Sequence, residues 1–211
     1  MRNDATGPVI TRQETTFPGA RRADFPARPA LPYSLLLTPA GTARSQQLPL
    51  ELVRRDIAGD RPGVPLMLRI RVLGALTGDP VASAVVDIRH IAPDNGEFLR
   101  GAQTTDPQGY AEFRTIHPGW LPGQAVQIRA EVHLGGYLAG GRSVAHTGRL
   151  YFPEDLTTQV TALPPYREQT TARTPNDDDP EATTGAILNA VPRDRYDIAS
   201  GILAGITVAV N

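Results

Sequence analysis

The sequence lacks two residue types whose absence excludes whole classes of site. It contains no cysteine, and all 21 of its basic residues are arginine, so lysine is absent too. Without cysteine there are no disulfides, no thiolate metal sites and no cysteine nucleophile. Without lysine there is no Schiff base, no P-loop and no Ser-Lys dyad. The reliance on arginine, with 20 glycines and 20 prolines in 211 residues, is also typical of a GC-rich genome.

An excess of charge of one sign and long apolar runs are lacking as well. The 21 basic and 22 acidic residues leave a net charge of -1, without the basic excess that nucleic-acid binders show. No apolar run approaches the roughly 20 residues of a membrane-spanning helix. The first 32 residues have no apolar segment of the secretory type, so Arg21-Arg22 is not read as an export signal. We therefore expect a cytoplasmic protein that binds neither nucleic acid nor membrane.

The remaining composition predicts one folded domain preceded by an arm. Hydrophobic residues make up 40% of the chain, which is enough for a core. Residues 1–32 are rich in proline, arginine and threonine and show no periodicity, so we expect a flexible N-terminal arm. The folded domain would then comprise residues 33–211.

Short apolar runs within that domain predict an all-β fold. Residues 66–73 alternate at period two, and further strand-like runs lie at 84–90, 110–116, 126–134, 147–152 and 196–210. Turn sequences separate them at 77–80, 93–96, 106–109 and 118–119. One short helix is expected at 153–161 and a polar loop at 174–184. Many short strands with little helix indicate a sandwich or a barrel.

Seven segments stand in an order and at a spacing that are characteristic of one family. They are residues 51–57, 60–66, 86–90, 98–101, 103–106, 113–120 and 146–154. Together they resemble the intradiol ring-cleavage dioxygenases, which are the catechol, hydroxyquinol and protocatechuate enzymes. The resemblance runs from about residue 34 to the C-terminus. It implies a two-sheet β-sandwich with a site in loops and strands at one side, and a homodimer formed with help from the arm and from a leading strand at 51–57.

The ligands of that family's iron site are missing from this chain. The family holds a non-haem ferric ion through two tyrosines and two histidines, three of them in a Gly-Trp-Tyr-Pro-Gly-Arg…His-x-His motif. Here Leu121 stands at the tyrosine position, and Gln127 and Arg129 stand at the histidine positions. The other tyrosine is lost with a shortened loop before Phe98. Leucine cannot ligate a metal and arginine keeps its proton, so we expect no iron and no other cofactor.

The replaced positions predict a pocket for an anion instead. Gln127, Arg129 and Glu131 alternate along one strand and so face the same side. An arginine there could stabilise a developing oxyanion without a metal, so we expect an anionic or enolised substrate. The predicted catalytic residues are Arg129, Gln127, Gln124 and Arg149, and the predicted substrate-binding residues are Leu121, Trp120 and Tyr151. Alternatively, Arg129 pairs with Glu131 and seals an obsolete cavity.

The four histidines show no metal-binding pattern. His90 and His146 lie in motifs where the resembling family has non-ligand histidines, and we expect structural roles for them. His117 is expected in a loop, and His133 alternates onto the same face as Arg129 but farther along the strand. A new metal site could form from scattered histidines and Tyr110 or Tyr151, but we find no ligand pair two or four residues apart to support one.

Two classes of function remain open. The first is a cofactor-independent enzyme of specialised metabolism that cyclises, isomerises or dehydrates its substrate. The second is a non-catalytic protein, either a structural subunit or a small-molecule binder, for which the iron-free subunit of the protocatechuate enzymes is a precedent. A true intradiol dioxygenase with altered ligands ranks third. An open, polar cavity at Arg129 would favour catalysis or binding, and a filled one would favour a scaffold.

Overall fold

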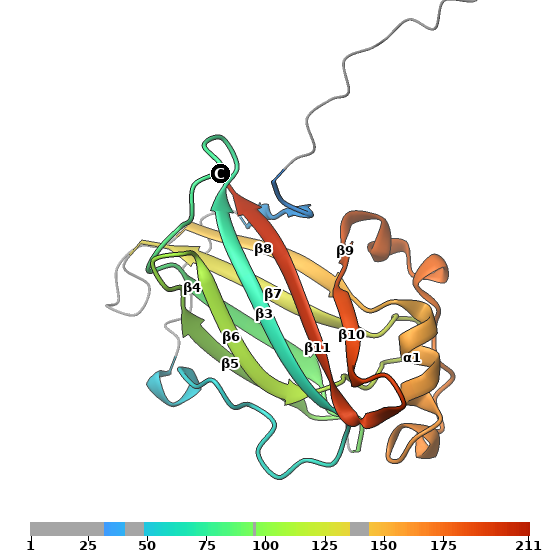
Figure 1. Ribbon diagram of the computed structural model, residues 1–211. Coiled ribbons are helices and arrows are strands. Elements are labelled where there is room, and N and C mark those ends of the chain that lie inside the picture. Colours follow the sequence, from blue (N-terminus) through green and yellow to red (C-terminus); the bar gives the residue numbers. More distant parts are fainter. Residues whose placement is uncertain (1–31, 41–48, 95, 136–143) are drawn as a thin grey trace, which may run out of the picture. The chain divides into compact units, whose positions relative to one another are not determined.

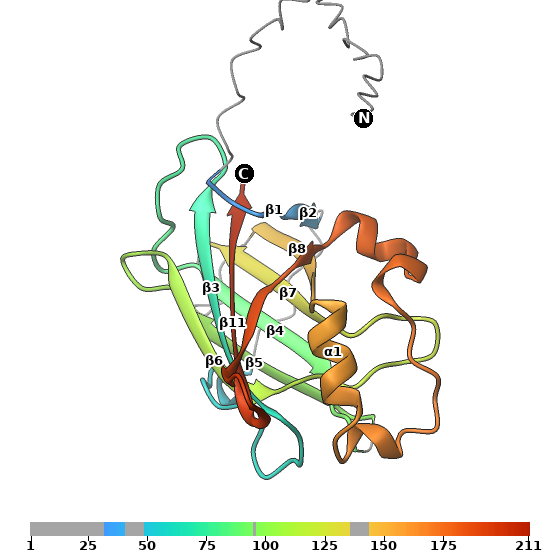
Figure 2. The same ribbon diagram turned by 45° about the vertical axis from the view of Figure 1, so that its right-hand side comes forward.

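The computed structural model describes residues 32–40, 49–94, 96–135 and 144–211. Nearly all of the expected arm, residues 1–32, lies outside these ranges. The described chain is built from two sheets, drawn as two layers in Figures 1 and 2. The first sheet has the order β1-β11-β3-β6, with β10 paired to β11, and the second has the order β2-β8-β7-β4-β5, with β9 paired to β8.

The chain passes several times between the two sheets. The first sheet comprises β1 (Leu35–Leu36), β3 (Pro65–Gly74), β6 (Tyr110–Ile116), β10 (Asn189–Asp194) and β11 (Asp197–Val210). The second comprises β2 (Thr38–Ala40), β4 (Val85–Ile91), β5 (Phe98–Thr104), β7 (Gln127–Leu134), β8 (Val144–Tyr151) and β9 (Ala186–Ile187). This two-sheet arrangement confirms the all-β sandwich.

The core lies between the sheets and is filled by every second residue of the central strands. Leu68 and Ile70 of β3 are fully buried, as are Ile88 of β4 and Ile128 of β7. They belong to one apolar cluster that draws on both sheets. The side chains that alternate with these buried residues point to the outer faces of the sheets. Arg129 alternates with the buried Ile128 on β7, so it lies on the outer face of the second sheet.

One short helix, α1 (Glu154–Thr161), lies where it was expected, and it packs beside β10 and β11 (Figure 2). Glu154 and Asp155 occupy its first turn, where a carboxylate is favoured by the helix dipole. Leu156 and Val160 are buried in the core cluster. The other helical segments of the described ranges are 3-10 turns at Leu50–Leu52, Tyr166–Glu168, Asn176–Asp178 and Pro180–Thr184. No helix in the described residues is long and apolar enough to cross a membrane.

The leading strand expected at 51–57 is absent, and this part of the expectation was wrong. The segment begins as a 3-10 turn and then forms two isolated bridges, from Val53 to β5 and from Asp56 to β6. Because β5 and β6 are edges of different sheets, a segment that pairs with both cannot continue along either. It crosses between them, and Ile57 packs so closely on Gly101 that a Cβ added there would lie 2.2 Å from its side chain.

Candidate anion-binding pocket

Four arginines stand side by side across the outer face of the second sheet. Strand register pairs Arg100 of β5 with Arg89 of β4, Arg89 with Arg129 of β7, and Arg129 with Arg149 of β8. We call this set the arginine row. Directly paired side chains share a face of the sheet, and neighbouring strands are about 4.8 Å apart, so like charges are held close together at a cost in free energy.

Only the two ends of the arginine row are neutralised by carboxylates. Arg100 donates to both oxygens of Asp87, to Oδ2 at 2.6 Å and to Oδ1 at 3.1 Å, and Arg149 pairs with Glu181 at 2.6 Å. Within the described residues, no carboxylate oxygen lies within 4.0 Å of the guanidinium groups of Arg89 and Arg129. Partial burial, and then the charges of Arg129 and Arg100, lower the pKa of Arg89. The nearby carboxylates of Glu131 and Asp87 act in the opposite direction but more weakly, so the two central arginines carry positive charge without a direct ion-pair partner in the described residues.

The arginine row borders an open pocket with a volume of about 240 Å³. Its lining combines three guanidinium groups, two amides and an apolar wall. The lining residues are Arg89, His90, Ile91, Phe98, Gly119, Trp120, Leu121, Gln124, Ala125, Gln127, Arg129 and Arg149. Six of the seven residues predicted from the sequence are among them, so the structure brings them together; the role of each stays a prediction.

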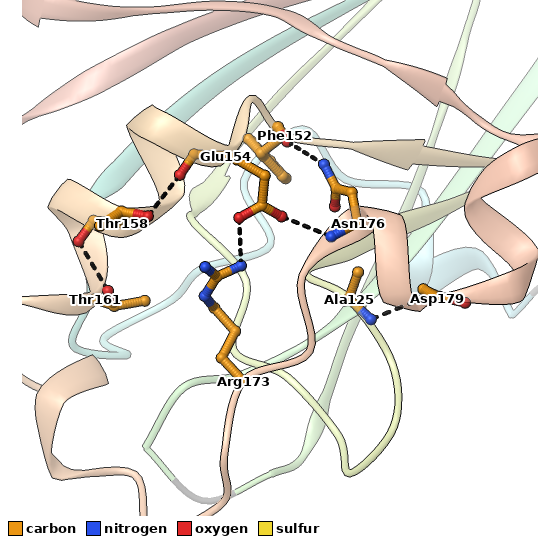
Figure 3. Close-up of polar contacts among 8 residues, drawn as sticks. All are labelled: Ala125, Phe152, Glu154, Thr158, Thr161, Arg173, Asn176 and Asp179. Carbon is orange, nitrogen blue, oxygen red and sulfur yellow. Dashed lines mark hydrogen bonds and ion pairs between the residues drawn. The ribbon is translucent and has the colours of Figure 1, made fainter.

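The loop that forms the far wall of the pocket is held by the segment that follows α1. Trp120 donates its indole N–H to the carbonyl oxygen of Thr171 at 2.8 Å. The backbone N–H of Ala125 donates to the carboxylate of Asp179 at 2.9 Å, as Figure 3 shows. Asp179 also caps the 3-10 turn that follows it by accepting from the N–H of Glu181. Both contacts fix the 119–125 loop against the rest of the chain.

The segment that follows α1 is held to the helix by Glu154. The carboxylate of Glu154 accepts from the guanidinium of Arg173 at 2.7 Å and from the backbone N–H of Asn176 at 2.7 Å (Figure 3). The amide of Asn176 donates to the carbonyl oxygen of Phe152 at 2.8 Å. Residues 174–184 were expected only as a polar loop, so these roles were missed. The Asp179-Pro180 pair, an N-cap residue before a first-turn proline, was the available signal.

Tyr151 lies outside the pocket, although it was predicted to bind substrate. Its side chain is buried, and a Cβ added at Gly185 would lie 2.3 Å from the ring. Burial, and then the nearby charge of Asp179, raise the pKa of Tyr151 to about 12, so its hydroxyl stays neutral. Tyr151 therefore supports the sheet next to the pocket, covered by the backbone at Gly185.

Two of the histidines are neutral structural groups. His90 donates from Nδ1 to the carbonyl oxygen of Ile91 at 3.1 Å and accepts at Nε2 from the hydroxyl of Thr115 at 2.7 Å. His117 donates from Nδ1 to the carbonyl oxygen of Pro118 at 3.0 Å, and its ring packs on that of Phe152. Burial lowers the pKa of His90 to about 4 and that of His117 to about 3.

The pocket does not fit the ferric ion that the resemblance implies. A ferric ion needs anionic or neutral donors such as phenolate, carboxylate or imidazole. Leu121 and Arg129 cannot serve as such donors, and the one imidazole of the described lining, His90, uses both nitrogens in hydrogen bonds. These side chains therefore do not form an iron site of the kind that the resemblance implies.

A different group of metal-type ligands lies farther along the same face. Ligand atoms of Asp87, Glu131 and His133 are within 4.8 Å of one another. Glu131 and His133 stand two residues apart on β7, a spacing missed because Glu131 was not considered as a ligand. Both oxygens of Asp87 are already bound by Arg100, so the group is a poor cation site. The carboxylate of Glu131 lies 4.0 Å from Nε2 of His133. Within the described residues no ion pair joins Glu131 to Arg129, which was the alternative considered for Arg129.

Solved structures that resemble this chain are dioxygenases. The intradiol ring-cleavage dioxygenase from Tetranychus urticae is 24% identical with a TM-score of 0.66, over 83% of this chain and 94% of that one. The dioxygenase domain of a dioxygenase–carbohydrate-binding fusion from the cellulolytic bacterium Streptomyces sp. SirexAA-E is 21% identical with a TM-score of 0.55, over 74% and 86%. Comparison with family models found no match, and comparison with curated proteins found none. The chain therefore has the fold of the intradiol dioxygenases.

Proposed function

We propose that this protein binds an anionic or enolised small molecule in the arginine-lined pocket and converts it without a metal or other cofactor. The observation that carries the proposal is that Arg89 and Arg129 line an open pocket without a direct ion-pair partner among the described residues. A bound anion would relieve the repulsion between these two side chains. The apolar groups of Ile91, Phe98 and Trp120 would cover the carbon skeleton of the ligand.

The arginines would act by stabilising negative charge on the ligand. A hydrogen bond to a charged group contributes about 1.5–3 kcal/mol, and one pKa unit corresponds to about 1.4 kcal/mol. One such bond from Arg129 would therefore lower the pKa of a bound enol by roughly one to two units. Gln124 and Gln127, whose side chains hydrogen-bond each other at 3.2 Å, would orient the ligand at the same wall.

Among cyclisation, isomerisation and dehydration, cyclisation of a substrate that arrives as an anion or enol fits this pocket best. Within the described lining, His90 is the one ionisable side chain that could accept a proton near neutral pH, and both of its nitrogens are engaged in hydrogen bonds. The protein would therefore contribute orientation and charge rather than a proton acceptor. The same observation favours a second candidate, a small-molecule binder that performs no reaction, and turnover of the bound ligand distinguishes the two.

The proposal is tested by replacing Arg129 with methionine, which keeps the length of the side chain and removes its charge. The probes are benzoate, followed by calorimetry, and the 1,3-diketone acetylacetone, whose enolate is followed by its ultraviolet absorption. We expect Arg129→Met to weaken binding of both about 10- to 150-fold, which is the range of one charged hydrogen bond. The control is Arg193→Met on β10, an exposed arginine of the other sheet. Unchanged binding by a folded Arg129→Met variant would overturn the proposal.

A further inference from the structure

A second and smaller cavity adjoins the same arginines. It has a volume of about 70 Å³, and its lining residues are Thr38, Arg129, Thr147, Gly148, Arg149 and Thr184. The larger pocket extends from Arg129 toward Gln127, whereas the small cavity extends from Arg149 toward Thr147. Because β7 and β8 are antiparallel, Gln127 and Thr147 lie on opposite sides of the Arg129–Arg149 pair. The two cavities therefore flank this part of the arginine row.

The small cavity is lined mainly by hydrogen-bond donors. Thr38 and Thr147 are directly paired between β2 and β8 and so share a face of the sheet. Within the described residues, no hydrogen bond engages either of these two hydroxyls. The hydroxyl of Thr184 already donates to the carbonyl oxygen of Glu181 at 3.0 Å. Two free hydroxyls and two guanidinium groups form a donor set that suits an oxyanion.

The size and the charge of the site agree with a small anionic group. A water molecule takes about 30 Å³ in the liquid, so the cavity has room for a carboxylate or a phosphate-type group but not for a ring. Glu181 opposes an anion here, but its charge is already balanced by Arg149. Of the two guanidinium groups that line the cavity, that of Arg129 has no ion-pair partner in the described residues, so it is available to an anionic group of a ligand.

We propose that the small cavity is an oxyanion subsite, and that it receives a carboxylate or phosphate-type group of the same ligand whose body occupies the larger pocket. The second part rests on the proposed function, and the first part does not. The ligand class would then be a small molecule with two anionic groups, one an enolate or equivalent facing Arg89 and Arg129, and the other held between Arg129 and the paired threonines.

The test uses the full chain and four kinds of probe: inorganic phosphate alone, benzoate, acetylacetone, and the dicarboxylates isophthalate and terephthalate. Thr147→Val removes one hydroxyl and keeps a β-branched side chain that suits a strand. We expect it to weaken phosphate binding about three- to tenfold and to leave binding of acetylacetone, which carries no carboxylate and probes the larger pocket alone, within twofold. Glu181→Gln should strengthen phosphate binding because it releases Arg149. The matched control is Thr104→Val, an exposed threonine of β5 in the same sheet.

The outcomes separate the subsite from the proposed function. A dicarboxylate that binds at least tenfold more tightly than benzoate, and that phosphate displaces, supports a subsite for the ligand's own group. If phosphate binds as expected but neither dicarboxylate binds more tightly than benzoate, the cavity holds a free inorganic anion and the second part is overturned. If benzoate binds but phosphate does not, or Thr147→Val equals the wild type, the subsite is overturned and the proposed function stands. Binding of phosphate without benzoate would instead remove the proposed function alone.

Discussion

Replacing His117 with phenylalanine should flatten the dependence of stability on pH. His117 is fully buried, with its ring against those of Phe152 and Tyr166, and burial lowers its pKa to about 3. The other charged or titratable groups that act on it are His90 and Arg173, and both disfavour its protonation. Phenylalanine keeps a flat ring at this position and removes the titrating group.

The size of the effect follows from the difference between the folded and the unfolded chain. A histidine in the unfolded chain titrates near pH 6.5, so below that pH the unfolded state binds a proton that folded His117 does not bind. This contribution to stability is fully present above about pH 6.5 and is lost as the pH falls toward 3. At 1.36 kcal/mol per unit, His117 lowers the free energy of unfolding by about 2 kcal/mol between pH 8 and pH 5. His90 adds a similar loss, because its pKa is lowered to about 4.

The assay is urea unfolding at pH 8, 6 and 5, followed by far-ultraviolet circular dichroism. The variant carries a constant offset from the loss of its hydrogen bond to Pro118 and from the larger ring, of about 1–3 kcal/mol at every pH. Its decline between pH 8 and pH 5 should be about 2 kcal/mol smaller than that of the wild type. His117→Asn provides a second variant without the larger ring. Curves that run parallel for all three proteins would refute the reasoning.

Three further predictions concern the metal, the pocket wall and the assembly. The purified protein should be colourless and free of stoichiometric iron; one iron per chain by elemental analysis would contradict this. Asp179→Ala removes the acceptor for the N–H groups of Ala125 and Glu181, so the melting temperature should fall by about 4–12 °C, from about 2–3 kcal/mol, whereas the exposed Asp177→Ala should change it little. The chain should scatter light as a dimer at micromolar concentration, and deleting residues 1–32 should weaken that dimer; a monomer with or without these residues would count against it.

The sequence predicted the central strands well because alternation alone decides which residues are buried. In β3, Leu66 and Leu68 are buried while Met67 between them is half-exposed, as period two requires. Alternation did not predict β5, because Arg100 and Gly101 interrupt its apolar pattern and both residues serve contacts with distant parts of the chain. Arg100 binds Asp87, and Gly101 makes room for Ile57. β10 was missed as well, since its exposed edge has no apolar alternation.

The candidate site was predicted only as far as single motifs allow. Arg129 was predicted because it stands at a histidine position of the resembling motif. Arg89 was not predicted, because it becomes a neighbour of Arg129 only through the register between β4 and β7, which the sequence does not show. Asp179 was missed because its partner, Ala125, lies 54 residues away. Tyr151 was placed in the pocket because nothing in the local pattern shows that Gly185 covers its ring.

The arginine row should make the free protein and its complexes respond to salt in opposite directions. Repulsion among Arg89, Arg129 and their neighbours acts over a few ångströms at a partly solvated surface, and the screening length falls from about 10 Å at 0.1 M salt to about 3 Å at 1 M. Added salt should therefore raise the melting temperature of the free protein, since it weakens a repulsion that unfolding would release. The same salt should lower the affinity for anions, since it weakens the attraction that holds them. Sodium perchlorate would mix both effects because its anion binds to guanidinium groups. Sodium chloride titrations at constant pH are therefore the cleaner measurement of how much electrostatic free energy these four side chains store.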